Sequence, residues 1–198
     1  MRIHSDSFAA HSKIPGEFAF GVPGDAEPMS LGTNRNPHLA WGEVPDATRS
    51  FALICVDDDV PAVFDDANQP GRVIRADQPR RDFIHWVMVD IPASLREIAA
   101  GTCSDGVNAA GKHNPPGPTG ARQGVNDYGA AHQGYDGPCP PWNDERLHHY
   151  HFRLYALDVP TLAVAPHFTA ADALRAMHGH VLAMAQLTGT YTLNKVLR

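Results

Sequence analysis

The features that most constrain what this chain can fold into are a continuous apolar run at residues 51–56 (FALICV) and a second, mostly apolar run at residues 83–91 (FIHWVMVDI). Short apolar runs of this kind are typical of central strands that are buried on both faces of a sheet. Residues 57–82, which join them, are polar and aperiodic and therefore predict a long loop. Because parallel strands are joined by crossover helices, irregular connections favour an antiparallel sheet or sandwich.

The chain has 198 residues, a length that fits one domain spanning residues 1–198. Its 17 Pro and 17 Gly predict short elements and long loops. Alternation along residues 83–91 places His85, Val87 and Val89 on one face of that strand. The other predicted elements in the first half of the chain are a strand at 17–20 and a helix at 94–100 closed by Gly101. In the second half they are two strands or one bent strand at 150–157, a helix from the capping box of Thr169 and Asp172 to about residue 187, ended by Gly189, and a strand at 191–193.

Charge and cysteine content exclude several classes of protein. The net charge is −6 and no basic run is longer than Arg80-Arg81, so a nucleic-acid backbone has no basic stripe to bind. The first residues contain no apolar signal-peptide core, and no stretch is long and apolar enough to predict a membrane span. Cys55, Cys103 and Cys139 are odd in number and form no C-x-x-C pair. This predicts reduced thiols and a cytoplasmic protein, with Cys139 the most reactive of the three.

Common catalytic and nucleotide-binding motifs are absent. The chain contains no G-x-S-x-G, no Walker loop, no G-x-G-x-x-G after a strand and no H-E-x-x-H. His149 and His151 share one face of a predicted strand and are the best candidates for metal ligands. Metal sites on such strands usually add a carboxylate a few residues on, and no Glu follows Glu145. We therefore expect neither a metal nor a cofactor.

Four segments in order carry a family resemblance: NPHLAW (36–41), ALICVDDDVP (52–61), HWVMVDIP (85–92), and GYDGPCPP (134–141) leading into HHY (148–150). Together they resemble the phosphatidylethanolamine-binding protein family, in its bacterial Raf-kinase-inhibitor-like branch, from about residue 14 to Leu193. The resemblance implies a mainly β fold, with a large antiparallel sheet packed on a smaller one and short peripheral helices. It also implies a pocket for phosphate-like anions at one end of the sheet, with the ligand-binding residues Asp57, Asp59, His85, Cys139, Pro140, Pro141, His148 and Tyr150.

Two residues depart from the family pattern near this pocket. Asp58 stands where the family motif has a proline, which adds a negative charge, and His149 stands where it has an arginine, which removes a permanent cation. Two Asp and two His can still receive a small anion, provided that the acids face the histidines and not the ligand. We therefore predict that Asp57, Asp59, His85, His148 and Tyr150 converge on one pocket.

Three functional hypotheses follow. The first is a non-enzymatic binding or regulatory protein for a phosphate-like anion, such as a phospholipid head group or a phosphorylated group. The second is an inhibitor that acts on a kinase or a protease through protein contacts. The third is a hydrolase or lyase that uses Asp/His acid–base pairs, although no nucleophile stands beside those pairs. The resemblance to bacterial members also predicts a homodimer.

Overall fold

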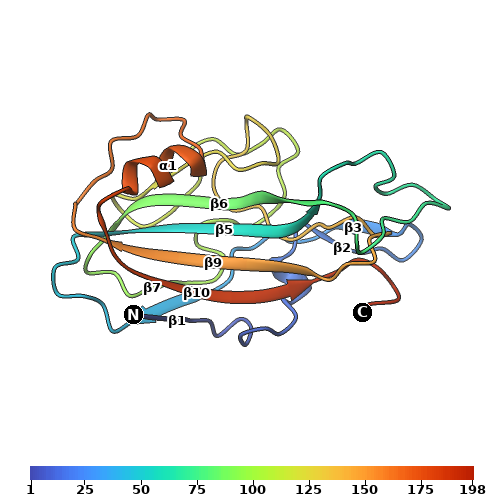
Figure 1. Ribbon diagram of the computed structural model, residues 1–198, viewed down its shortest axis with the longest axis horizontal. Helices are drawn as coiled ribbons and strands as arrows, with labels where there is room; N and C mark the ends of the chain where they lie inside the picture. Colours follow the sequence, from blue (N-terminus) through green and yellow to red (C-terminus); the bar gives the residue numbers. More distant parts are fainter.

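A five-stranded antiparallel sheet dominates the computed structural model, which describes residues 1–198 (Figure 1). Its strand order is β10-β9-β5-β6-β8, with bounds Val181–Tyr191, His148–Leu157, Ser50–Pro61, Arg80–Pro92 and Arg122–Gln123. A three-stranded sheet contains β1 (Arg2–His4), β4 (Leu39–Gly42) and β7 (Glu97–Ile98), and a two-stranded sheet contains β2 (Gly21–Pro23) and β3 (Met29–Leu31). The helices are a 3-10 turn at Gly16–Phe18 and α1 at Ala170–Met177. The predicted fold class is confirmed.

The apolar run in β5 is continuous because both faces of this strand are buried. Phe51, Leu53 and Cys55 pack into a core of 22 residues that also takes side chains from β4 and β7 of the three-stranded sheet. Ala52 and Ile54 point the other way, into a second core that includes residues of α1. Figure 1 shows α1 next to the large sheet, above β6. Alternation with period two thus buries every residue of the run.

The strands β5 and β6 are longer than the apolar runs that predict them. Strand β5 continues to Pro61 and β6 begins at Arg80, so the connecting loop is shorter than the predicted 57–82. Consequently Asp57 and Asp59 lie on a strand and not in a loop. The extension is stable because β9 begins beside it, with Asp57 paired to Tyr150 across the two strands.

A β-bulge changes the direction of His85. Cys55 of β5 pairs with Trp86, but the next residue, Val56, pairs with Ile84, which leaves His85 as the extra residue of β6. The ring of His85 lies 5.0 Å from that of Tyr150, whereas Val87 and Val89 pack into the core on the opposite face. The prediction that His85 shares a face with Val87 and Val89 is therefore wrong, because a bulge interrupts strict alternation.

The segment after α1 is a strand and not a continuation of the helix. Thr169 and Asp172 form the predicted capping box, but the helix ends at Met177 and Gly179 has φ +83°. Residues 181–191 then form β10, which pairs with β9 along its length. The prediction of a helix to residue 187 and a strand at 191–193 is wrong because hydrogen bonding to β9 outweighs a helix-like spacing of apolar residues.

Two short predicted elements are also wrong. Residues 94–100 contain turns and β7, in which Ile98 is buried and pairs with Leu39, in place of a helix. Residues 17–20 include the end of the 3-10 turn in place of a strand. Tertiary contacts with the large core decide both cases. No helix in the structure has the length and apolar character that crossing a membrane requires.

Candidate functional site

A small cavity at the end of the large sheet collects most of the predicted site residues. Its volume is about 180 Å³. A larger hollow of about 440 Å³, beside the C-terminal residues 193–198, contains none of the predicted residues. Buried polar groups, Asp57 and His85 among them, converge on the small cavity. Its lining residues are Asp57, Val60, Phe64, Phe83, His85, Tyr128, Cys139, Pro140, Pro141 and Tyr150.

Tyr150 supplies a hydrogen-bond donor to the cavity. Strand alternation along β9 turns His148 and Tyr150 inward. The hydroxyl oxygen of Tyr150 is buried and makes no hydrogen bond of ordinary geometry within the protein, although the Asp57 carboxylate is close enough to interact with it. Burial raises the pKa of Tyr150, and the charge of Asp57 raises it further, so the hydroxyl keeps its proton at neutral pH. A buried hydroxyl without a partner is uncommon in proteins, because its desolvation is then uncompensated.

His85 faces the same cavity with a defined orientation. Its Nδ1 donates to the carbonyl oxygen of Asp136 at 2.7 Å. The Asp136 side chain is held in turn by Lys112 Nζ, Asn34 Nδ2 and Asn126 Nδ2, each at 2.8 Å. Burial lowers the pKa of His85, against a smaller raising effect of Asp57, so the ring is neutral near pH 7. A neutral ring whose Nδ1 carries the proton presents a lone pair at Nε2.

The wall opposite the strands is the segment 137–141. Gly137 packs so closely that a Cβ there would lie 2.0 Å from the carbonyl oxygen of Phe18, so no other residue fits without displacement of the backbone. The hydroxyl of Tyr128 donates to the Gly137 carbonyl at 2.7 Å. Pro140 and Pro141 have no N–H group, which leaves this part of the wall without amide donors.

His148 does not line the cavity but lies behind Asp57. Its Nδ1 is 2.7 Å from Asp57 Oδ2 and its Nε2 is 3.2 Å from Asp144 Oδ2, and all three side chains are buried. A ring between two carboxylates needs a proton on each nitrogen. Burial acts to lower the pKa of His148, but the hydrogen bonds with Asp144 and Asp57 outweigh it and raise the pKa to about 9. His148 is therefore an imidazolium that orients Asp57.

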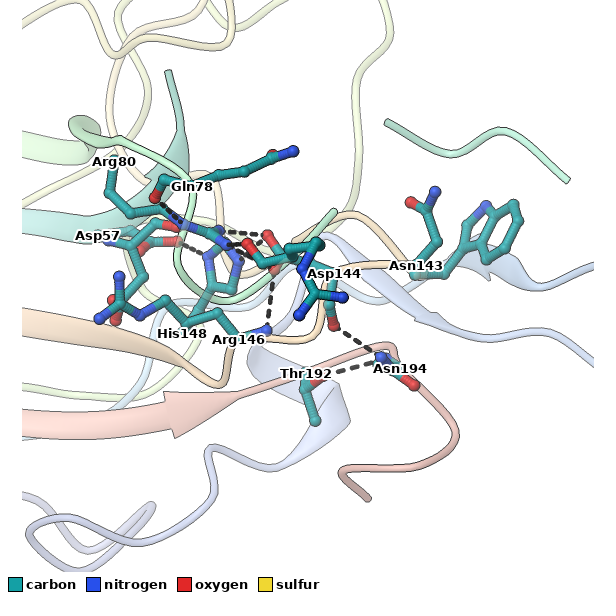
Figure 2. A network of polar contacts seen from close by, with 12 residues as sticks. Asp57, Gln78, Arg80, Asn143, Asp144, Arg146, His148, Thr192 and Asn194 are labelled. Carbon is teal, nitrogen blue, oxygen red and sulfur yellow. Dashed lines mark hydrogen bonds and ion pairs between the residues drawn. The ribbon is translucent and has the colours of Figure 1, made fainter. Parts of the chain in front are cut away.

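Asp144 is the hub of this buried network (Figure 2). Besides His148, it binds Arg80 through both carboxylate oxygens, at 2.5 and 3.0 Å. Burial acts to raise the pKa of Asp144, but hydrogen bonds with His148 and Arg80 lower it. Its backbone carbonyl accepts from Asn194 Nδ2, and its N–H donates to the Pro141 carbonyl at 3.1 Å. The network thus connects the cavity wall to the C-terminal segment.

Arg80 is saturated with acceptors and is not free to bind a ligand. Apart from Asp144, its guanidinium donates to the backbone carbonyls of Asp59, Arg75 and Gln78 at 2.9, 2.8 and 3.2 Å. Its side chain is only 6% exposed. The chain Asp57–His148–Asp144–Arg80 therefore alternates in sign and sums to zero charge.

The two departures from the family pattern are matched by partners elsewhere in this chain. His149 Nδ1 donates to Asp59 Oδ2 at 2.7 Å, and Arg146 Nε lies 3.0 Å from Asp59 Oδ1. Arg146 thus supplies a permanent cation near His149, which stands where the family pattern has an arginine. Asp58 pairs with His151 Nε2 at 3.1 Å. Asp59 therefore lies beside the cavity without lining it.

These contacts also bear on metal binding. The one group of three potential metal-ligating side chains with atoms within 4.8 Å of one another is Asp57, Asp58 and Asp59. Each of these carboxylates already has a histidine partner. His149 and His151 stack at a ring distance of 6.4 Å, and they are not part of that group.

The cysteines are free thiols, in agreement with the predicted absence of disulfides. Cys55 and Cys103 are buried, and Cys139 is partly exposed at the cavity. Burial raises the pKa of the Cys139 thiol to about 11. Although Cys139 is the most accessible of the three, it is not an activated nucleophile.

Sequence reasoning missed several residues that build this site. Phe83 and Tyr128 line the cavity, whereas Arg80, Asp144 and Arg146 hold its acids and His148 in place. Tyr128, Asp144 and Arg146 come from an irregular stretch without periodicity, so no local pattern marks them. Arg80 was part of a predicted loop. The one sequence pattern close to these missed residues is the HHY triplet, which begins four residues after Asp144.

Comparison with known proteins agrees with this architecture. A UPF0098 protein of Aquifex aeolicus is 31% identical over 191 residues, which cover 96% of this chain and 88% of that protein. The UPF0098 protein YbhB of Escherichia coli is 30% identical over 192 residues, covering 97% and 100%. The crystal structure of E. coli YbcL, described as a new member of the mammalian PEBP family, has a TM-score of 0.71 at 28% identity, covering 96% of this chain and 97% of that one.

A structure of a PEBP homologue, CT736 of Chlamydia trachomatis, is also similar, with a TM-score of 0.68 at 28% identity. The family model for phosphatidylethanolamine-binding protein matches residues 4–192. The match includes both apolar strands, the 137–141 wall and the histidines of β9. The chain therefore belongs to the phosphatidylethanolamine-binding protein family.

Proposed function

We propose that this protein binds a small phosphate-like anion, carried by a phospholipid head group or a phosphorylated molecule, in the cavity formed by Asp57, His85 and Tyr150. The observation that carries the proposal is the buried Tyr150 hydroxyl, which makes no hydrogen bond of ordinary geometry within the protein and has the Asp57 carboxylate as its neighbour. The backbone N–H of Cys139, another lining residue, also donates no hydrogen bond within the protein. Oxygen atoms of an anion would satisfy both donors.

The size and walls of the cavity indicate which part of a ligand enters. A volume of about 180 Å³ is below the range of about 300–1,000 Å³ that is usual for drug-sized ligands. Phe64, Phe83 and Tyr128 give it an aromatic lining. The cavity therefore receives the charged end of a ligand, while the remainder stays outside.

The chemistry of the lining favours binding over turnover. The Cys139 thiol has a pKa of about 11 and is not a ready nucleophile. His148 is enclosed between two carboxylates and does not reach the cavity, so it cannot exchange protons with a ligand there. His85 and the Asp57 carboxylate remain as proton acceptors, without an activated hydroxyl or thiol beside them. We propose a non-enzymatic role on these grounds.

Tyr150→Phe is expected to weaken binding of inorganic phosphate by about tenfold, because an anion oxygen loses a buried donor worth about 1 to 2 kcal/mol. Isothermal titration calorimetry at pH 6 measures the change. Tyr155→Phe is the matched control, since Tyr155 lies on the same strand but packs against the second core. Equal affinity of the Tyr150→Phe variant and the wild type would remove Tyr150 from the ligand site.

We further propose that two copies pair along β10, an edge strand of the large sheet. Near Thr188 and Thr190 its outer edge is covered by hydrogen bonds to residues 11–14. The segment 181–187 (VLAMAQL) has no backbone hydrogen-bond partner on that side, and it contains no charge and no proline. Met184 is 51% exposed there. Sheets normally protect free edges with charges or prolines. An uncharged edge is self-complementary across a two-fold axis.

Light scattering is expected to give twice the monomer mass of 21.5 kDa. Met184→Lys should yield the monomer, because two like charges would meet at the paired edges. Circular dichroism of the variant shows whether the fold is retained. A wild-type protein that scatters as a monomer at micromolar concentration contradicts pairing.

A further inference from the structure

The cavity contains hydrogen-bond acceptors that a fully deprotonated anion cannot satisfy, because such an anion has no O–H group to donate. Asp57 lines the cavity as a carboxylate, since the imidazolium of His148 is 2.7 Å away. Its Oδ1 accepts one hydrogen bond from the Asp59 N–H, and its Oδ2 accepts one from His148. Each carboxylate oxygen has two acceptor positions. Asp57 therefore keeps acceptor capacity toward the cavity.

His85 adds a second acceptor. Its Nδ1 must carry the proton, because it contacts a carbonyl oxygen, that of Asp136, which only accepts. Its Nε2 has no partner within the protein and, in the neutral ring, presents a lone pair. The titratable groups around His85 are Asp57, Asp136, His148, Tyr128 and Tyr150.

No permanent cation offsets these acceptors. None of the ten lining residues is Lys or Arg. The charges of Arg80 and His148 are matched by Asp144 and Asp57. Arg81 lies over the rings of Phe64 and Phe83, with its guanidinium carbon 5.4 and 5.8 Å from their centroids, and is not itself a lining residue.

A fully deprotonated anion in this cavity would therefore bring its charge against a carboxylate and a lone pair. Those contacts are repulsive, and they leave two acceptors unpaired, which is costly in a buried site. One acidic O–H on the ligand removes the conflict. It donates to Asp57 or to His85 Nε2, while the remaining ligand oxygens accept from Tyr150 and from the Cys139 N–H.

We propose that the cavity takes up its anion together with one proton, and so selects phosphomonoesters in their monoprotonated form over sulfate monoesters and phosphodiesters of similar size. This inference rests on the proposed anion-binding function and narrows its ligand class, because it favours ligands that end in a phosphomonoester over the phosphodiester head groups of ordinary phospholipids. Phosphomonoesters have a second pKa of about 6 and still carry an acidic O–H near neutral pH. Sulfate monoesters and phosphodiesters carry none. They require protonation of His85 itself, which burial opposes.

Calorimetric titration with methyl phosphate, methyl sulfate and dimethyl phosphate tests the selectivity. At pH 6, methyl phosphate is expected to bind at least about tenfold more tightly than the other two, the effect of leaving one buried acceptor unpaired. Its affinity should fall by about tenfold per pH unit above pH 6 to 7, as the monoanion disappears. Titration at pH 8 in buffers of different ionisation enthalpy should show uptake of about one proton per bound methyl phosphate.

Asp57→Asn provides the matched variant, because an amide at this position can donate to a deprotonated oxygen. The ratio of methyl phosphate to methyl sulfate affinity should then fall toward one. If this variant does not fold, the three ligands on the wild-type protein decide the question alone. Equal affinity for methyl phosphate and methyl sulfate at pH 6, or no proton uptake at pH 8, would overturn the inference. Failure of all three ligands and of phosphate to bind would instead overturn the proposed anion-binding function.

Discussion

Replacing His148 with Ala is expected to lower the free energy of unfolding by about 3 to 5 kcal/mol at pH 7, the usual cost of breaking a buried ion pair from one side. The substitution leaves the buried Asp57 carboxylate without its imidazolium partner. Urea denaturation followed by tryptophan fluorescence measures the change. His149→Ala is the matched control: its pair with Asp59 is partly exposed, with 42% of the His149 side chain accessible, and its loss should cost at most about 1 kcal/mol.

The same residue predicts a pH dependence of stability. The pKa of His148 is about 9 in the folded protein and 6.5 as its ordinary value. The folded state binds this proton more tightly, so the stabilisation is complete below pH 6.5 and is lost as pH rises through 9. The difference between the folded and the ordinary pKa of His148 corresponds to about 3 kcal/mol of unfolding free energy. The wild-type unfolding free energy should fall across this window, and the His148→Ala variant should lack that decrease. An identical slope in both proteins would show that His148 is not charged in the folded state.

Removing the hub of the network should have an effect of similar size. Asp144→Ala leaves the Arg80 guanidinium buried without a carboxylate, and His148 with one partner in place of two. We expect a loss of about 3 to 5 kcal/mol in unfolding free energy. Asp158→Ala serves as the comparison, because the pair of Asp158 with His180 is about half exposed.

A double-mutant cycle separates the Arg80–Asp144 interaction from general damage to the fold. Arg80→Met keeps the length of the side chain and removes its charge, so that Arg80→Met/Asp144→Ala leaves no unpaired guanidinium. The double variant is expected to be more stable than the sum of the two single losses predicts, by about 1 to 3 kcal/mol. Strict additivity would contradict a direct interaction between the two side chains.

Local sequence patterns predicted the direction of those site side chains that lie on a regular strand. His148 and Tyr150 turn inward because alternation on β9 is uninterrupted. His85 could not be placed in this way, because the bulge between Ile84 and Trp86 depends on the register with β5. The acids beside these residues lay on an extension of β5 that depends on its pairing with β9.

By itself, the sequence determined the class of fold and the strands at its centre. The run at residues 51–56 is apolar at every position and needs cover on both faces, and loops rich in Gly and Pro leave antiparallel pairing as the way to provide it. Thr169 and Asp172 likewise determined where the single α-helix begins, since a capping box involves only residues three apart.

Only the tertiary structure decided how the polar residues are shared between the cavity and its support. His148 meets Asp57 across 91 positions of sequence, and Arg80 meets Asp144 across 64. Hydrogen bonds of this kind depend on which chain segments pack together, and no spacing within one segment encodes them. For the same reason the structure places His148 in the buried network and leaves Asp57, His85 and Tyr150 to face the cavity.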